Sequence, residues 1–242
     1  MPSDPRALIP DVDAPLPEGD RKTASVQAMF DVIAPRYDLV NRVMTFRMDV
    51  GWRRRTVDAL GLVPDSLVLD LACGTGDLAR DLIARGHVPV GADLSFGMLA
   101  AAPEPFPRMQ ADGSALPLPD GAVDGATCGF ALRNFTVLAD TVTELARVVR
   151  PRGRIALLEV AEPPSKIMRF GHGIYFGHVV PRLGGLLSDG AAYRYLPRSV
   201  AYLPPPDELL ELIADCGFTD VRRSLLSGGI AQLLTATRGS AR

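Results

Sequence analysis

Residues 68–76 read Val-Leu-Asp-Leu-Ala-Cys-Gly-Thr-Gly, and this stretch decides the fold. Its apolar start shows no alternation, which is typical of a strand buried on both faces of a parallel sheet. Gly74 and Gly76 permit a turn that a side chain would block. A helical pattern begins at Asp77, and a strand, a glycine turn and a helix start together form a site of nucleotide size.

Strand and helix patterns alternate along most of the remaining chain. Further strands are expected at 89–93, 109–112, 125–132 and 155–160, and helices at 77–83, 96–102, 138–149 and 207–217. Two last strands, at 218–226 and 230–237, are separated by a hairpin-length connection. This order predicts an α/β fold: a doubly wound, mostly parallel, seven-stranded Rossmann-like sheet with a C-terminal antiparallel hairpin.

Three segments lie outside this alternation. Residues 1–21 contain few large apolar side chains, so we expect a disordered tail, followed by a single domain over 22–242. Apolar residues at helical spacing predict N-terminal helices over 23–61. Residues 161–203 are expected to form an inserted cap near the strand ends, where substrate specificity resides.

The composition argues against several classes of protein. No apolar run approaches the roughly 18 residues of a membrane span, and the N-terminus lacks a signal-peptide pattern, so we expect a cytoplasmic protein. A net charge of −2 argues against a nucleic-acid partner, which needs a concentrated basic face. Cys73, Cys128 and Cys216 lack a metal-ligand spacing, so we interpret them as reduced thiols and expect no metal.

Three successive predicted strands end in aspartate. Asp93 is placed to accept hydrogen bonds from two ribose hydroxyls, and Asp112 to accept from an adenine amino group. The glycine pattern by itself also fits a dinucleotide site. Asp70, directly before the turn, would repel a pyrophosphate but suits a cationic ligand that carries an ammonium and a sulfonium, such as S-adenosylmethionine.

Several motifs carry a resemblance to a known family. They include Ala34-Pro35-Arg36-Tyr37-Asp38, residues 69–77, Leu116-Pro117-Leu118-Pro119-Asp120, Phe130-Ala131-Leu132-Arg133-Asn134, and Tyr193 with Tyr195. From residue 26 to residue 234 the sequence resembles the menaquinone/ubiquinone biosynthesis C-methyltransferases, a class I S-adenosylmethionine-dependent family. The resemblance implies C-methylation of a prenylated demethylmenaquinol ring in menaquinone biosynthesis, with no metal.

The candidate site residues combine this resemblance with the strand-end pattern. Cofactor-binding residues are expected at Asp70, Gly74, Thr75, Gly76, Asp93, Asp112, Gly113 and Gly129. As a hypothesis, Arg133 stabilises the quinolate, Asn134 orients the hydroxyl or a water that acts as base, and Tyr37 holds the ring. Substrate-binding residues are expected at Asp38, Asn41, Tyr193 and Tyr195.

Other interpretations remain open. Four departures from the family pattern, at Asp49, Ala131, Arg152 and Val160-Ala161, leave the exact substrate undecided. The alternatives are a methyltransferase for another aromatic or polyketide molecule, a dinucleotide-dependent oxidoreductase, or a binding protein without turnover. Residues 53–55 are three arginines, which predict a solvated face and, as a weaker hypothesis, peripheral contact with anionic lipid at the inner face of the membrane. The apolar cap is a candidate homodimer surface.

Overall fold

The computed structural model describes residues 8–9, 16–103, 105–166, 168–169 and 198–240. Its strands are β1 (Leu67–Leu71), β2 (Val88–Asp93), β3 (Arg108–Gln110), β4 (Val123–Gly129), β5 (Val149–Val160), β6 (Phe218–Leu226) and β7 (Ala231–Arg238). They form a seven-stranded sheet in the order β3-β2-β1-β4-β5-β7-β6, in which β7 runs antiparallel to both neighbours. The predicted α/β sheet with a C-terminal antiparallel pair is confirmed.

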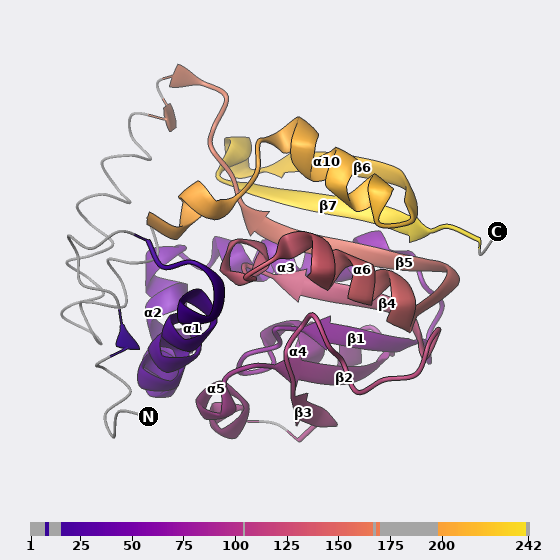
Figure 1. Ribbon diagram of the computed structural model, residues 1–242, viewed down its shortest axis with the longest axis horizontal. Helices are drawn as coiled ribbons and strands as arrows, with labels where there is room; N and C mark the ends of the chain where they lie inside the picture. The colour runs from indigo at the N-terminus through magenta and orange to yellow at the C-terminus, as the bar shows by residue number, and fades with distance from the viewer. Residues whose placement is uncertain (1–7, 10–15, 104, 167, 170–197, 241–242) are drawn as a thin grey trace.

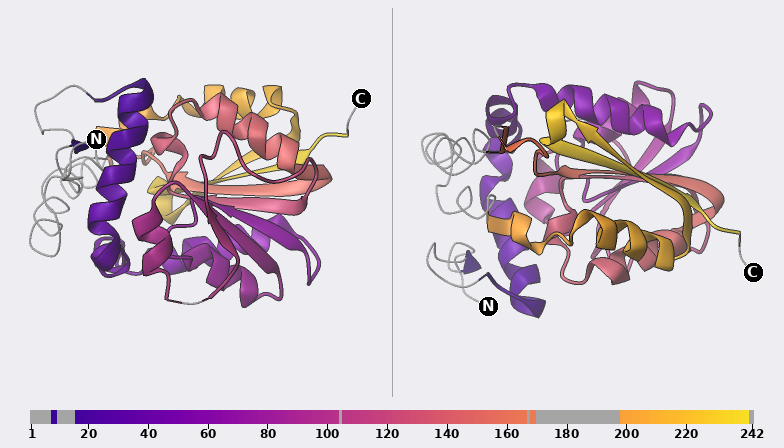
Figure 2. Two further views of the ribbon diagram at one scale, coloured as in Figure 1. Left: turned by 60° about the horizontal axis from the view of Figure 1, so that its bottom comes forward. Right: turned by 90° about the horizontal axis from the view of Figure 1, so that it is seen from above.

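Helices cover both faces of this sheet. They are α1 (Gly19–Ile33), α2 (Tyr37–Met44), α3 (Met48–Leu60), α4 (Asp77–Ile83), α5 (Phe96–Ala101), α6 (Leu138–Val148) and α10 (Pro206–Asp215). Short 3₁₀ turns are η2 (Ala34–Arg36), η3 (Leu132–Asn134), η5 (Val200–Tyr202) and η6 (Ser227–Gly229). Helices α3 and α4 pack on one face and α6 and α10 on the other, whereas α1 and α2 lie across the ends of the strands (Figures 1 and 2).

The core has two layers, one on each side of the sheet, because successive strand residues point to opposite faces. In β1, Val68 belongs to the apolar cluster that contains Trp52 of α3, and its neighbour Leu69 belongs to the cluster that contains Leu145 of α6. Both β1 residues are fully buried. Full burial of such a side chain is worth about 1.5–3 kcal/mol, so β1 anchors the sheet from which the glycine turn starts.

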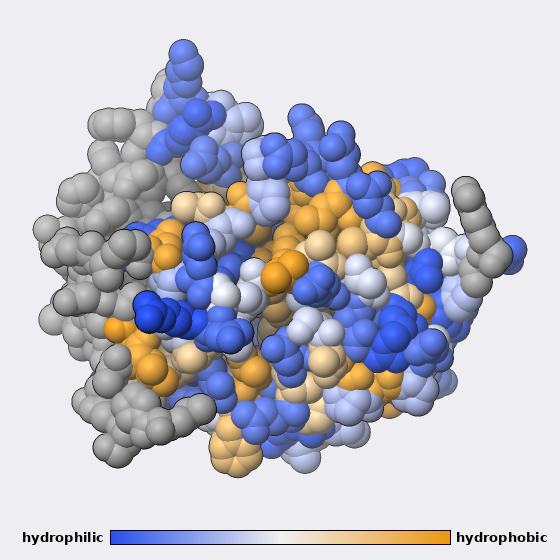
Figure 3. All heavy atoms as spheres, in the orientation of Figure 1, coloured by the Kyte–Doolittle hydropathy of each residue, from blue (hydrophilic) through white to orange (hydrophobic). Residues whose placement is uncertain are grey.

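The outer helices are amphipathic. On α10, Leu209 and Ile213 are buried, whereas Glu208 and Glu211 are exposed. Figure 3 shows hydrophilic side chains gathered over the outer side of the region that α10 occupies in Figure 1. The apolar positions recur every three to four residues, the spacing that keeps one face of a helix on a core. Within the described residues, no helix is long and apolar enough to cross a membrane.

The structure differs from the sequence-based expectations at several boundaries. Helix α1 begins at Gly19, inside the segment expected to be disordered, and Leu16 packs against the cluster beneath α1. Strand β3 ends at Gln110, so Asp112 lies two residues beyond the strand and not at its tip. Most of the expected cap, residues 170–197, lies outside the described residues.

Candidate active site

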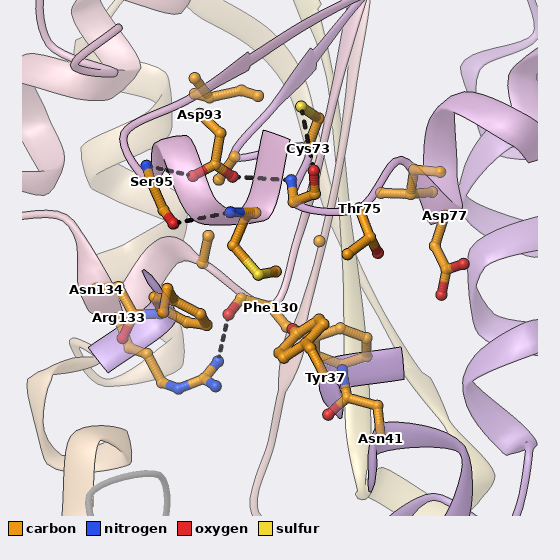
Figure 4. A pocket seen from close by; sticks show the side chains of 18 of the residues that line it. Tyr37, Asn41, Cys73, Thr75, Asp77, Asp93, Ser95, Phe130, Arg133 and Asn134 are labelled. Atoms are coloured by element: carbon orange, nitrogen blue, oxygen red, sulfur yellow. Dashed lines mark hydrogen bonds between the residues drawn. The ribbon is translucent and has the colours of Figure 1, made fainter. Parts of the chain in front are cut away.

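A cavity of about 520 Å³ lies where the carboxyl ends of the parallel strands meet α1 and α2. Tyr37 and Asn41 line it from α2, and Arg133 and Asn134 line it from η3 (Figure 4). The glycine turn after β1 and the turn after β2 close the remaining side. The topology places the site here because parallel strands bring all their carboxyl ends to one edge of the sheet.

Asp93 ties two of these turns together. One carboxylate oxygen accepts from the backbone N–H of Gly74 at 2.8 Å, and the other accepts from that of Ser95 at 2.8 Å (Figure 4). Burial raises the pKa of Asp93. A carboxylate has about four acceptor sites, so the oxygens that hold these turns retain capacity for hydroxyl donors.

Asp70 is a fully buried acid at the wall of the cavity. One of its oxygens accepts from the Thr127 hydroxyl at 2.9 Å, and the other, Oδ2, has no partner among the described residues. Burial, together with the negative charges of Asp93 and Asp77, raises the pKa of Asp70 to about 7, although the hydrogen bond from Thr127 opposes the shift. A buried carboxyl group with an unsatisfied oxygen is well suited to a cationic ligand.

The glycines of the site have different structural roles. Gly74 lines the cavity, where a Cβ would lie 3.0 Å from the Met98 methyl group. Gly76 has a positive φ of 84° and packs against Phe106, which a Cβ would approach to 2.5 Å. Gly76 does not line the described cavity, so the structure shows it holding the turn, and its expected contact with the cofactor stays a prediction.

The remaining predicted cofactor residues, Asp112, Gly113 and Gly129, line the cavity. The Oδ1 atom of Asp112 accepts from the backbone N–H and the hydroxyl of Ser114, both at 2.8 Å. This turn fixes Asp112 at the rim although β3 ends earlier. A Cβ on Gly113 would lie 3.0 Å from the Phe135 ring, so the chain passes close to this wall.

Tyr37 presents a phenol to the cavity. Burial raises its pKa, while a hydrogen bond with Asn41 and the positive charge of Arg133 lower it. Its ring packs edge-to-face on Phe30 of α1, with the ring centroids 5.9 Å apart. Arg133 is therefore close enough to act electrostatically on the phenol of Tyr37.

Arg133 is buried and ion-paired with the fully buried Glu159 at the end of β5. Its guanidinium also donates to the backbone oxygen of Phe130 at 2.8 Å and to the Ser199 hydroxyl at 3.1 Å. The neighbouring carboxamide of Asn134 is buried, and both its polar atoms lack a partner among the described residues. Buried polar groups are normally satisfied, so Asn134 is poised to bind a ligand.

The substrate-binding role expected of Asp38 stays a prediction, because its carboxylate accepts from the Thr75 hydroxyl at 2.6 Å and does not line the cavity. The expectation of a solvated face is wrong for Arg53, because it is surrounded by the acids Asp49, Asp77 and Asp81.

Other expectations fall outside what the structure describes. Tyr193 and Tyr195 lie outside the described residues.

The part of the chain that is described contains no group of three metal-ligating side chains, and its cysteines are free. Burial raises the pKa of Cys73 and Cys128, so neither thiol is activated as a nucleophile.

Comparison with known proteins assigns the chain to a family. The model of the ubiE/COQ5 methyltransferase family matches residues 18–238. The chain belongs to this family. It is 45% identical to a demethylmenaquinone methyltransferase of Thermus thermophilus over 87% of this chain and all of that protein. It is 41% identical to a ubiquinone/menaquinone biosynthesis C-methyltransferase UbiE of Syntrophotalea carbinolica, over 90% and 96% of the two chains.

Solved structures of low identity share the fold. A possible histamine N-methyltransferase of Thermotoga maritima matches with a TM-score of 0.63 and 16% identity, over 88% of this chain and 99% of that one. The [4+2]-cyclase SpnF matches with a TM-score of 0.66 and 15% identity, over 94% and 98% of the chains. Because a cyclase has the same fold, the fold alone does not assign the activity.

The protein is an S-adenosylmethionine-dependent C-methyltransferase of the ubiE/COQ5 family, and the cavity fits this cofactor. Asp70 has an unsatisfied buried oxygen, the chain is closely packed at Gly74 and Gly113, where a Cβ would lie 3.0 Å from Met98 or Phe135, and Asp93 keeps acceptor capacity. Asp93 could accept from the ribose, Asp112 could accept from the adenine, and Asp70 could face the cationic end.

Glu159 and Asp31 also belong to the site, although the sequence pattern did not identify them. Glu159 neutralises Arg133, and Asp31 contacts the turn that carries Asp93 through Ser95. Side chains that hold two elements together in this way act through contacts between distant segments, which the sequence does not show. For Glu159 a signal was present, because it stands near the end of a buried strand as Asp70 and Asp93 do.

Proposed function

We propose that this protein transfers a methyl group to a ring carbon of a prenylated demethylmenaquinol. The observation that carries the proposal is the relative from Thermus thermophilus, a demethylmenaquinone methyltransferase matched over its whole length at 45% identity. The family assignment removes the dinucleotide-dependent oxidoreductase from consideration.

The cavity chemistry supports this class of substrate. Its wall contains the aromatic side chains of Phe30, Trp52 and Phe130 together with methionines, which suit a fused ring and a prenyl chain. The polar side chains of Arg133 and Asn134, from η3, and of Tyr37, from α2, line this apolar space (Figure 4). A mostly apolar pocket with a few convergent polar groups is typical of a small-molecule site.

Bound S-adenosylmethionine supplies an electrophilic methyl group. The chain must make the ring carbon nucleophilic, which requires loss of a proton from a neighbouring phenol. An ordinary phenol has a pKa near 10; burial raises the pKa of Tyr37, and the hydrogen bond with Asn41 and the positive charge of Arg133 lower it in part. The positive charge of Arg133 would likewise lower the pKa of a quinol hydroxyl bound near it. Asn134 can accept a hydrogen bond from that hydroxyl or donate one to the quinolate oxygen.

Positioning contributes the rest of the acceleration. A well-oriented pair of reactants gains up to about 7–11 kcal/mol over reactants free in solution. Tyr37 is held by Phe30 and Asn41, and Arg133 is held by Glu159, so neither side chain must be ordered when substrate arrives. The chain thereby supplies a preorganised wall against which a flat ring can pack.

The deciding experiment is a methyl-transfer assay with purified protein, S-adenosylmethionine and a short-chain demethylmenaquinol kept reduced with dithionite. We expect a product heavier by one methylene unit, methylated on the ring carbon. Transfer to a benzoquinol precursor is the second candidate, supported by the UbiE relative from Syntrophotalea carbinolica. Turnover of an unrelated aromatic or polyketide acceptor, with neither quinol methylated, would contradict the proposal.

A prenylated substrate also favours peripheral contact with anionic lipid, to which the exposed Arg54 and Arg55 could contribute. Arg53 is excluded from this role because acids surround it. Changing Arg54 and Arg55 to Gln should reduce sedimentation with anionic vesicles but not with neutral ones. Equal sedimentation of the variant and the wild type would remove this proposal.

A further inference from the structure

The N-terminal helix α1 is hydrogen-bonded directly to the turn between β2 and α5. A carboxylate oxygen of Asp31, on the last turn of α1, accepts from the Ser95 hydroxyl at 2.5 Å and from the backbone N–H of Gly97 at 2.9 Å. These segments are more than 60 residues apart in sequence. The same helix lines the cavity with Val26, Gln27 and Phe30.

The contact continues to Asp93. The Ser95 hydroxyl that donates to Asp31 accepts from the backbone N–H of Met98 at 3.1 Å, which caps α5. The backbone N–H of Ser95 donates to Asp93 at 2.8 Å. Asp31 therefore fixes the residue that in turn fixes Asp93 (Figure 4 shows the Asp93–Ser95 part).

Close packing at Gly97 supports a specific fit. A Cβ at this position would lie 2.9 Å from the Asp31 carboxylate oxygen and 3.0 Å from the Asp31 Cα atom. Any side chain at Gly97 would push α1 away from the turn, because backbone atoms cannot move aside as a flexible side chain does.

Two carboxylates near one turn repel each other unless donors hold them. Burial raises the pKa of Asp93, and the negative charge of Asp31 adds to this. The arrangement therefore costs electrostatic energy. Proteins tolerate such costs mostly at functional sites.

We propose that Asp31 is a positioning residue for the cofactor, because it bonds α1 to the Asp93 turn and so makes the docking of α1 a condition for tight cofactor binding. The helix that forms a wall of the acceptor cavity is thereby coupled to the carboxylate that receives the ribose. This inference rests on the ribose assignment of Asp93 but not on the identity of the methyl acceptor.

The first experiment is calorimetry with S-adenosylhomocysteine and the full chain. Asp31→Ala should raise the Kd at least about tenfold, because two hydrogen bonds to a charged acceptor are lost. Asp20→Ala, which removes an exposed carboxylate from the same helix, is the matched control and should bind as the wild type. Circular dichroism checks that each variant is folded. A Kd within twofold of the wild type for folded Asp31→Ala would overturn the proposal.

A double-mutant cycle asks whether Asp31 acts through Asp93. If it does, Asp31→Ala/Asp93→Asn should bind S-adenosylhomocysteine no more weakly than Asp93→Asn alone. Additive losses would overturn the proposal, and so would a neutral effect of Asp93→Asn. These outcomes involve no methyl acceptor, so they are separate from failure of the proposed reaction.

Two further variants guard against misfolding. Asp31→Asn keeps an acceptor without the charge, and it should raise the Kd by less than Asp31→Ala but more than twofold. Gly97→Ala should also raise the Kd for S-adenosylhomocysteine, although it removes no hydrogen-bonding group. Binding by both variants at the wild-type affinity would show that α1 does not control the turn.

Discussion

The carboxyl group of Asp70 lies inside the protein, and its pKa is raised to about 7 from an ordinary value of 3.8. The folded state therefore holds a proton that the unfolded state has lost between about pH 4 and pH 7. Stability contributed by this proton is fully present below pH 4 and is lost as the pH rises towards 7. A cationic ligand beside Asp70 would favour the carboxylate, so it would restore the stability that is lost as the pH rises.

Asp70→Asn should remove this dependence in the free protein. The difference in unfolding free energy between variant and wild type should grow from pH 4 to pH 7 in favour of the variant. Each pKa unit corresponds to about 1.4 kcal/mol, so the gap is of the order of a few kcal/mol. Urea unfolding across this range measures it. Parallel pH profiles for the two proteins would contradict the assignment.

Arg133 and Glu159 form a buried pair whose structural and chemical roles can be separated. Arg133→Ala leaves Glu159 buried without its partner, which should cost about 3–5 kcal/mol of unfolding free energy. Arg133→Ala/Glu159→Ala should be less unstable than the sum of the single variants, because no unpaired charge remains. Denaturant titration of all four proteins completes the cycle.

Activity gives the second readout for this pair. If Arg133 acts on the quinol oxygen, the double variant should stay about 10²–10⁴-fold slower than the wild type even where it is folded. A folded double variant with the wild-type rate would show that Arg133 is structural only.

At the scale of elements, the glycine turn and helix α3 offer a matched pair of substitutions. Gly76→Ala introduces a Cβ 2.5 Å from the Phe106 ring at a φ of 84°, so it should destabilise the protein by about 1–3 kcal/mol. Gly51→Ala, inside α3 with no atom within 4 Å, should be neutral or stabilise by up to about 1 kcal/mol. Thermal unfolding compares them, and equal effects at both sites would contradict this account of the turn.

At the scale of the whole molecule, ligand binding should stabilise the folded chain. S-adenosylhomocysteine at 100 times its Kd contributes about 2.7 kcal/mol, which for a chain of this size raises Tm by roughly 5–10 °C. NADH at the same concentration should leave Tm unchanged, because Asp70 would repel its pyrophosphate. A Tm raised by NADH and not by S-adenosylhomocysteine would contradict the cofactor assignment.

The sequence by itself determined the order of strands and helices, the glycine turn and the place of Asp93, because these follow from local periodicity and from the conformational freedom of glycine. It also identified Asn134 and Tyr37, which line the cavity. Only the tertiary structure decided that Asp38 bonds to Thr75, that Arg53 lies among acids and that Glu159 neutralises Arg133. Apart from the Asp49–Arg53 pair within α3, these contacts join segments far apart in the chain, and local patterning carries no signal for which distant charged side chains meet after the layers pack.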